Sequence, residues 1–287
     1  MADKKTDKDA RQPIVRVVDL VKSFGGRVVL DGVNLEVYPG ETLVIMGGSG
    51  CGKSTVLRHM VGSLFPDSGY VELLGSDLND LDEPGLNALR LRFGILFQSG
   101  ALFNSMTVGD NVALPLREHT DLDAQTIEIM VKIKLELVGL REAEDLMPAE
   151  ISGGMKKRAG LARAIALDPE ILFYDEPSAG LDPVTSAEID QLMMDLTGKL
   201  GVSSVVVTHE MDSAFRIADR MAMLDRGVIL KVAPRSEFEA LRDGPESGDE
   251  RQDLIRQFLR GDSEGPITAR RLSTGYEDDI LEAAGAP

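Results

Sequence analysis

A glycine-rich segment that follows a short apolar run constrains the fold of this chain more than any other feature. The apolar residues 42–46 (TLVIM) lead into residues 47–55 (GGSGCGKST). This segment matches G-x-x-x-x-G-K-[ST], in which glycines let backbone N–H groups curl around phosphate oxygens. We therefore predict a strand, a phosphate-binding loop and a helix near 53–63, whose positive N-terminal end faces the same anion.

Two side chains of the loop have predicted roles: Lys53 reaches the β- and γ-phosphates, and the Ser54 hydroxyl ligates Mg²⁺. Other residues are expected to surround the nucleotide, chiefly through their backbone: Gly47, Gly48, Ser49, Gly50, Cys51, Gly52 and Thr55. The alternative is a chance glycine turn, which arises on the order of once per hundred chains of this length. The predicted strand and helix on either side favour the nucleotide.

A second apolar run ends in two acids. Residues 171–177 read ILFYDEP. If this strand ends at the same sheet edge as the phosphate loop, Asp175 can hold Mg²⁺, directly or through water. Glu176 can then polarise the attacking water as a general base. The alternative is a strand that ends in solvated acids, and the motif alone does not decide between the two.

A third segment is a second helix start suited to an anion. Residues 151–155 read ISGGM and precede KKRAGLARAIAL, which has the composition of a helix. Ser152 is a good N-cap, and Gly153 and Gly154 leave backbone N–H groups open. In isolation this turn indicates only a helix cap.

Phosphate loop, Ser-Gly-Gly turn and Asp-Glu strand, in this order, resemble the ATPases of ABC transporters. The family signature L-S-G-G-Q is matched by residues 151–155, with Ile151 for Leu and Met155 for Gln. The resemblance implies an α/β fold: a P-loop NTPase core with an antiparallel β subdomain and an inserted α-helical subdomain. It also implies ATP and Mg²⁺, and a head-to-tail pair in which Ser152, Gly153 and Gly154 of one copy complete the ATP site of the other.

Four further residues take family roles through this resemblance. Gln98, which we expect to end the strand FGILFQ, corresponds to the Q-loop that senses Mg²⁺ and the attacking water. Asp182 corresponds to the D-loop at the dimer interface, and His209 to the switch histidine at the γ-phosphate. Phe24 corresponds to the aromatic residue that stacks on adenine. A polar strand end, a turn, a structural histidine and a buried core phenylalanine are the respective alternatives.

The pattern along the chain predicts its organisation. Short β-branched runs dominate residues 14–38, helical periodicity dominates about 99–160, and strands alternate with helices after 170, as in a parallel sheet wrapped by helices. We expect a disordered tail at 1–12, an ATPase domain at 13–235 with a helical subdomain at about 99–160, and an acidic extension at 236–287. A docking helix is expected at 250–260, on its own core or on another protein.

Composition limits the environment and the partners. No run reaches the ~18–20 apolar residues of a transmembrane helix, and the charged residues 1–13 lack the apolar stretch of a signal peptide. With a single cysteine, we expect a cytoplasmic protein. The net charge of −17 opposes binding to nucleic acid and to anionic lipid. At a membrane, another protein must then hold this chain.

Residues between the motifs resemble one group of the family, the ATPases of Mla/Mce-type bacterial lipid-transport systems. The similar stretches are 97–103, 116–120 and 147–150, together with Met155. This resemblance implies phospholipid or a related lipid as cargo and the cytoplasmic face of the bacterial inner membrane as location. Implied partners are a second copy, an MlaE-like permease, an MCE-domain lipid-binding protein and, as a further candidate, a small regulatory subunit. Another cargo, or regulation of a membrane enzyme, remains an alternative.

Overall fold

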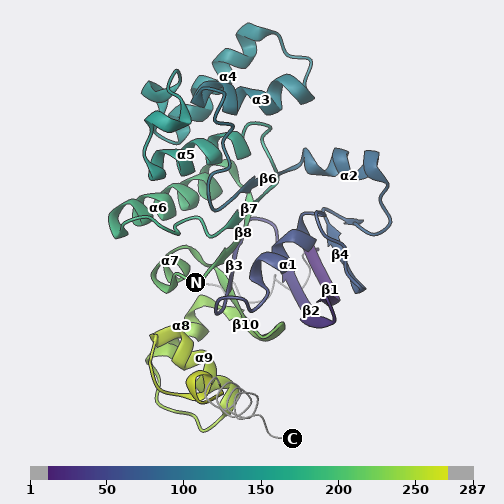
Figure 1. Ribbon diagram of the computed structural model, residues 1–287, viewed down its shortest axis with the longest axis vertical. Coiled ribbons are helices and arrows are strands. Elements are labelled where there is room, and N and C mark those ends of the chain that lie inside the picture. Colours follow the sequence, from purple (N-terminus) through teal and green to yellow (C-terminus); the bar gives the residue numbers. More distant parts are fainter. Residues whose placement is uncertain (1–11, 271–287) are drawn as a thin grey trace, which may run out of the picture.

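The computed structural model describes residues 12–270, so the tail expected at 1–12 lies almost wholly outside the described residues. A six-stranded sheet, in the order β10-β9-β3-β8-β7-β6, forms the centre (Figure 1). Every neighbouring pair is parallel except β9 and β10, which are antiparallel. The predicted parallel sheet is thus confirmed, whereas β10 was not predicted. The bounds are β3 (Thr42–Met46), β6 (Phe93–Leu96), β7 (Ile171–Asp175), β8 (Ser203–Thr208), β9 (Arg220–Asp225) and β10 (Val228–Pro234).

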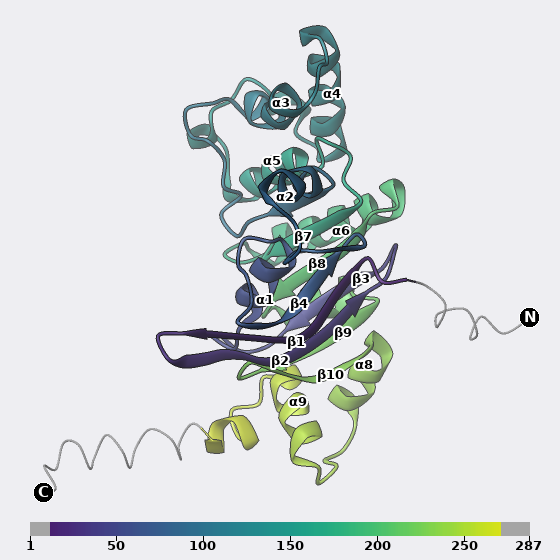
Figure 2. The same cartoon turned by 90° about the vertical axis from the view of Figure 1, so that its right-hand side faces the viewer.

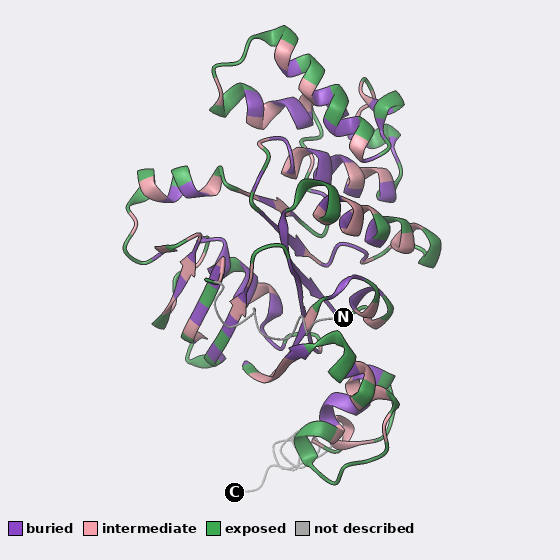
Figure 3. Cartoon of the chain, turned by 180° about the vertical axis from the view of Figure 1, so that it is seen from behind, coloured by how far each residue is buried: buried purple, intermediate pink, exposed green. Residues whose placement is uncertain are grey.

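The central sheet is buried on both faces, because successive side chains of a strand point to opposite sides. In β3, Val44 and Met46 pack into one hydrophobic cluster, and Leu43 and Ile45 into the other. This explains why the strands read as continuous apolar runs. Figure 3 shows the buried strands running through the middle of the molecule between more exposed layers.

One face of the sheet is covered by helix α1 and by an antiparallel sheet of order β2-β1-β4-β5. This sheet is the antiparallel subdomain that the family resemblance predicts. Figure 2 shows β1 and β2 as a long hairpin across this side of the molecule. The bounds are α1 (Lys53–Met60), β1 (Val15–Phe24), β2 (Arg27–Val37), β4 (Ser68–Leu73) and β5 (Ser76–Asp77).

The remaining helices cover the other face or extend from the sheet. Helices α3, α4 and α5 form the helical part at one end of the molecule (Figure 1). Within α4, Ile127, Val131 and Leu135 are buried along one face, in line with the helical periodicity expected at about 99–160. Among residues 12–270, none of the helices combines the length and apolar character needed to cross a bilayer. The bounds are α2 (Glu83–Arg90), α3 (Val108–His119), α4 (Ala124–Leu137), η1 (Arg141–Ala143), η2 (Pro148–Glu150), α5 (Gly153–Ala164), α6 (Pro183–Leu200) and α7 (Met211–Ile217).

The C-terminal part adds two helices at the opposite end, α8 (Arg235–Asp243) and α9 (Glu250–Arg260). On α9, Leu254, Ile255 and Leu259 are buried in the main hydrophobic cluster, and Phe258 packs against it. The apolar stripe that the sequence indicates therefore docks on the chain's own core. Residues 271–287 of the acidic extension lie outside the described residues.

Two glycine substitutions test this packing. A Cβ atom on Gly94, in β6, would lie 2.2 Å from the carbonyl oxygen of Ala164 at the end of α5. Gly94→Ala should therefore lower the free energy of unfolding by about 1–3 kcal/mol or more. At Gly198, an exposed position of helix α6, a Cβ meets nothing within 4 Å. Gly198→Ala should stabilise the protein by about 0.5–1 kcal/mol. Urea unfolding measures both, and equal shifts for the two variants would contradict the close approach of β6 to α5.

Candidate active site

The phosphate loop begins at the C-terminal end of β3, in the middle of the central sheet, and ends where α1 begins. Its shape requires glycine at two places. A Cβ on Gly47 would lie 2.2 Å from the carbonyl oxygen of Leu224, and one on Gly52 would lie 2.7 Å from Cδ2 of Leu30. Gly52 also has φ 112°, a conformation that L side chains rarely adopt. The loop is thus pressed against β2 and β9, while Ser49 and Gly50 at its tip are exposed.

Lys53, the first residue of α1, is only 8% exposed. Its ammonium group donates to the carbonyl oxygens of Gly47 at 2.7 Å and Gly48 at 3.1 Å. It also lies 4.0 Å from Oε1 of Glu176. A buried ammonium group needs such partners. Lys53 therefore stands inside the curl of the loop, where it can meet an incoming anion.

Ser54 and Asp175 meet across the edge of the sheet. The Ser54 hydroxyl donates to Oδ1 of Asp175 at 3.0 Å. A hydroxyl and a single carboxylate, both hard oxygen ligands, suit Mg²⁺ that keeps phosphate and water oxygens as its other ligands. Within residues 12–270, no group of three or more His, Cys, Asp or Glu side chains is placed to hold a metal by itself. The residues present therefore fit a metal that arrives with a phosphate ligand.

Glu176 and His209 also lie together, after β7 and β8. Nδ1 of His209 lies 2.9 Å from Oε2 of Glu176, and the backbone N–H of His209 donates to the same oxygen at 3.3 Å. Glu176 is buried, whereas the imidazole is half exposed. Glu176 also has φ 51°, which is uncommon for a side-chain-bearing residue and marks a backbone held by its surroundings. The predicted base is thus oriented by the predicted switch histidine.

The prediction that Gln98 ends a strand is wrong. Strand β6 ends at Leu96, and Gln98 lies exposed in the following turn. The chain turns there: the N–H of Gly100 donates to the carbonyl oxygen of Phe97 at 2.8 Å. Leu96 pairs with Tyr174 in the sheet, so Gln98 follows the same edge at which Glu176 follows β7. The structure leaves its expected role toward Mg²⁺ and water as a prediction.

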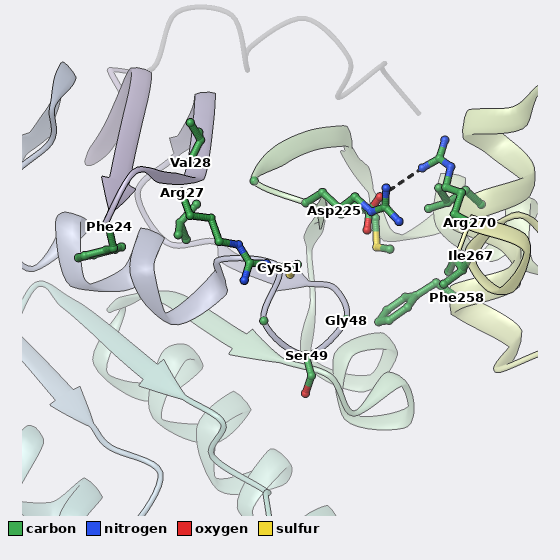
Figure 4. Close-up of a pocket in the computed structure, with 16 residues that line it drawn as sticks. Phe24, Arg27, Val28, Gly48, Ser49, Cys51, Asp225, Phe258, Ile267 and Arg270 are labelled. Carbon is green, nitrogen blue, oxygen red and sulfur yellow. Dashed lines mark ion pairs between the residues drawn. The ribbon is translucent and has the colours of Figure 1, made fainter. Parts of the chain in front are cut away.

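Phe24 lies at one side of a pocket of about 670 Å³ around the phosphate loop. Phe24 is 47% exposed, which excludes the alternative of a buried core phenylalanine. Figure 4 shows Phe24, Arg27 and Val28 on one side of the loop residues Gly48, Ser49 and Cys51. Burial raises the pKa of the Cys51 thiol, so the thiolate is disfavoured and the side chain serves packing.

The opposite wall of this pocket comes from the C-terminal part and was not predicted. Phe258 and Ile267 face the loop there, and Arg270 forms an ion pair with Asp225 at 3.5 Å (Figure 4). In the adjoining turn, the N–H of Gly227 donates to the carbonyl oxygen of Cys51 at 3.0 Å. The apolar stripe of α9 signalled docking, but only the fold reveals that the docked segment faces the phosphate loop.

The Ser-Gly-Gly turn and Asp182 lie next to each other, outside the pocket around the phosphate loop. The Ser152 hydroxyl accepts the N–H of Met155 at 3.2 Å as the N-cap of α5, and Ser152 and Gly153 are exposed. Asp182 caps α6 by accepting the N–H groups of Val184 and Thr185. None of the described residues that line the phosphate-loop pocket belongs to either turn. Within one chain, these turns therefore form a separate exposed surface with an open helix N-terminus.

Comparison with known proteins agrees with this geometry. The ABC transporter family is matched over residues 30–179. The chain is 42% identical to the intermembrane phospholipid transport ATP-binding protein MlaF of Escherichia coli K12 over 269 residues, covering 93% of this chain and 96% of that protein. It is 43% identical to the probable ribonucleotide transport ATP-binding protein mkl of Mycobacterium leprae over 283 residues, covering 96% of this chain and 79% of that protein.

Solved structures lead to the same family. The dimeric, post-hydrolysis ATP-binding cassette MJ0796 bound to ADP and Pi superposes with a TM-score of 0.71 at 30% identity, covering 77% of this chain and 98% of that one. CbiO1 of Clostridium perfringens, part of an ABC transporter complex, gives 0.74 at 29% identity, covering 79% and 91%. The phosphate loop, the two acids at the end of β7 and the sequence identity to these ATP-binding proteins over most of the chain therefore establish that this protein belongs to the ATP-binding subunits of the ABC transporter family.

Proposed function

We propose that this chain binds and hydrolyses ATP to drive a bacterial lipid transporter. The observation that carries the catalytic part is the meeting of Lys53, Glu176 and His209 at one sheet edge. Lys53 is placed to bind phosphate oxygens, and Glu176 is placed to accept a proton from the attacking water. His209, half exposed beside Glu176, orients that carboxylate and can reach the γ-phosphate.

Mg²⁺ completes the proposed site. Ser54 and Asp175 would hold it, and when bound it would neutralise phosphate charge. The hydrogen bond between their side chains keeps both oxygens at the same place. We assign Gln98 to the same region because its turn follows the adjacent strand end. The phosphate loop and Phe24 would hold the rest of the nucleotide, Phe24 by stacking on the base.

We propose that two copies close head to tail around ATP. The exposed turn at Ser152 leads into a helix of 12 residues, whose N-terminus attracts anions. This turn lines no part of its own chain's loop pocket, and we propose that a second copy brings it there. The cassette MJ0796 is described as dimeric with ADP and Pi. In the dimer, Asp182 would lie at the interface beside Ser152, since Gly153 and Gly154 pack near Leu181 and Thr185.

Phospholipid, or a related lipid, is the cargo we propose. The full-length correspondence with MlaF supports it, as do the stretches 97–103, 116–120 and 147–150 and Met155. The name of mkl specifies ribonucleotides instead, which makes nucleotide transport the second candidate. Transport by the assembled complex decides between the two candidates.

A groove of about 1080 Å³ is the proposed seat of the permease. Parts of α2, β6, α3 and α5 line it, and Phe97 and Phe103 expose 46% and 51% of their surface there. Large apolar side chains exposed together indicate a protein contact. We propose that a cytoplasmic helix of an MlaE-like permease fills the groove and holds this acidic chain at the inner membrane. An MCE-domain protein and a small regulatory subunit complete the proposed complex.

Replacement of the base tests the catalytic assignment. Glu176→Gln should lower ATP turnover by about 10²–10⁴-fold, because the amide cannot accept the proton. ATP should then hold the two copies together, visible as a dimer in size-exclusion chromatography with Mg²⁺ and ATP. Glu142→Gln, at an exposed position of η1 away from the phosphate loop, is the control. Unchanged turnover in Glu176→Gln would remove the assignment.

The ammonium group of Lys53 should govern binding rather than chemistry alone. Lys53→Ala removes a charged donor of the kind that contributes about 1.5–3 kcal/mol, so the Kd for ATP should rise by about ten-fold or more. Titration with a fluorescent ATP analogue measures this. Lys156→Ala, on a partly buried lysine of α5, is the control. An unaltered Kd for Lys53→Ala would place the phosphates elsewhere.

The groove can be tested independently of ATP. Phe97→Asp puts a charge in the apolar groove and should abolish recovery of the permease with the ATPase from solubilised membranes, while ATP binding is kept. Phe65→Asp introduces the same charge at an exposed phenylalanine outside the groove and should leave the complex intact. Purified complexes in vesicles then report whether phospholipid or ribonucleotide is moved. Recovery of the permease with Phe97→Asp contradicts the proposed docking site.

A further inference from the structure

Lys157 is a buried cation to which neither the sequence motifs nor the proposed chemistry assigns a role. It is the second of three consecutive basic residues in α5, and only 5% of it is exposed. Its neighbours Lys156 and Arg158 are partly exposed, and Arg158 forms an ion pair with Glu188 of α6 at 2.5 Å. Of the three, Lys157 alone is directed into the interior.

The ammonium group of Lys157 contacts the backbone of the proposed base. It donates to the carbonyl oxygen of Glu176 at 3.1 Å. The same oxygen accepts the N–H of Ala179 at 3.2 Å, which closes the turn after β7. Since Glu176 has φ 51°, its backbone persists in this conformation only while its surroundings hold it. Lys157 is one of the groups that do so.

The cost of burying this cation indicates that the contact is specific. Burial lowers the pKa of Lys157, while the nearby carboxylates of Glu176 and Asp175 act in the opposite direction. A buried amino group is retained only with polar partners and compensating charge. Both of its compensating carboxylates belong to the proposed catalytic strand end.

The helix that carries Lys157 also carries the exposed turn at Ser152, five residues earlier. The first turns of α5 are packed closely on the segment after Glu176. A Cβ atom on Gly154 would lie 2.6 Å from Cγ2 of Thr185, so the two backbones approach closely there. The ion pair between Arg158 and Glu188 adds a further contact between α5 and α6.

We propose that Lys157 is a positioning residue for Glu176, supplied by the same helix whose N-terminus closes the partner's ATP site. The role of the helix N-terminus at the partner's ATP site rests on the head-to-tail dimer proposed above. The positioning of Glu176 by Lys157 does not depend on that dimer. Lys157 holds the backbone of Glu176 so that its carboxylate keeps its place beside His209 and Lys53. Lys157 touches no substrate and acts through Glu176.

A lysine series tests the positioning role in the full-length protein. Lys157→Met should lower kcat for ATP hydrolysis by about ten-fold or more while KM stays within about two-fold, because binding groups are untouched. Lys157→Arg keeps a cationic donor and should restore most of kcat. Lys156→Met is the matched control and should behave as wild type. A wild-type kcat in Lys157→Met overturns the proposal.

A second variant, Lys157→Gln, covers the case in which Lys157→Met does not fold. The amide of Lys157→Gln is one bond shorter than the lysine amine and should fall short of the Glu176 carbonyl oxygen. It should therefore show the same loss of kcat at unchanged KM, with cooperative unfolding in urea retained. A folded Lys157→Gln protein with wild-type kcat equally overturns the positioning role.

Mixed dimers separate an effect on the subunit's own base from one exerted through the Ser152 turn. The first dimer pairs a Lys157→Met subunit with a Glu176→Gln subunit, so that Glu176 is present only in the subunit that lacks Lys157. The second dimer pairs a wild-type subunit with a subunit that carries both substitutions, so that Glu176 is present only in the subunit that keeps Lys157. Relative to a wild-type/Glu176→Gln dimer, the first should be slower by about ten-fold and the second equal. The reverse result overturns the proposal. Failure of Glu176→Gln to form any ATP-held dimer would instead refute the proposed dimer and leave the lysine series valid.

Discussion

The parallel register of β3, β8 and β7 is the constraint on which the site depends. Met46 pairs with Thr208, and Asp175 pairs with Val207, so the three strands end at the same edge of the sheet. The strand register consequently brings residues that are far apart in sequence to the same place, where their side chains can contact each other. A slip of one residue would exchange the side chains on the two faces of a strand. Because both faces are buried, the hydrophobic core enforces the register and thereby the geometry of the site.

Each charged group at this edge has a partner that phosphate or Mg²⁺ can replace. Lys53 donates to two carbonyl oxygens of its own loop, Asp175 accepts from Ser54, and Glu176 is close to His209. Such exchange lowers the desolvation cost of binding a triphosphate, since no charge is left bare before or after. The helix N-terminus and Lys53 form a local anion site within a chain of net charge −17. Anions are therefore attracted to the region around Lys53, whereas the rest of the acidic surface repels polyanions.

The sequence predicts the parts of the site that depend on local chemistry. The glycines around Lys53 and the acids at Asp175 and Glu176 follow apolar runs, and the structure brings these side chains to the same edge. The end of β6 was misplaced because Phe97 continues the apolar pattern of its strand although the chain turns there. Strand β10 was missed because its pairing with β9 is determined by the fold and not by an apolar alternation in the sequence of β10. The C-terminal wall of the pocket, with Phe258, could not be predicted because periodicity reveals an apolar face without revealing what the face contacts.

Lys157 shows the same limit more sharply. A lysine between two basic neighbours in a helix reads as part of a solvated face, and only the approach of α5 to the turn after β7 makes it interior. Its helix meets solvent at the Ser152 end and the proposed base about one and a half turns later. Because Gly154 packs against Thr185 with no space for a Cβ atom, the start of α5 cannot shift alone. In the proposed dimer, any force that the partner's nucleotide exerts on the exposed end of α5 would also act on the segment that follows Glu176. The packing of α5 thus places the surface proposed to serve the partner's site and the contact that holds the backbone of Glu176 on a single helix.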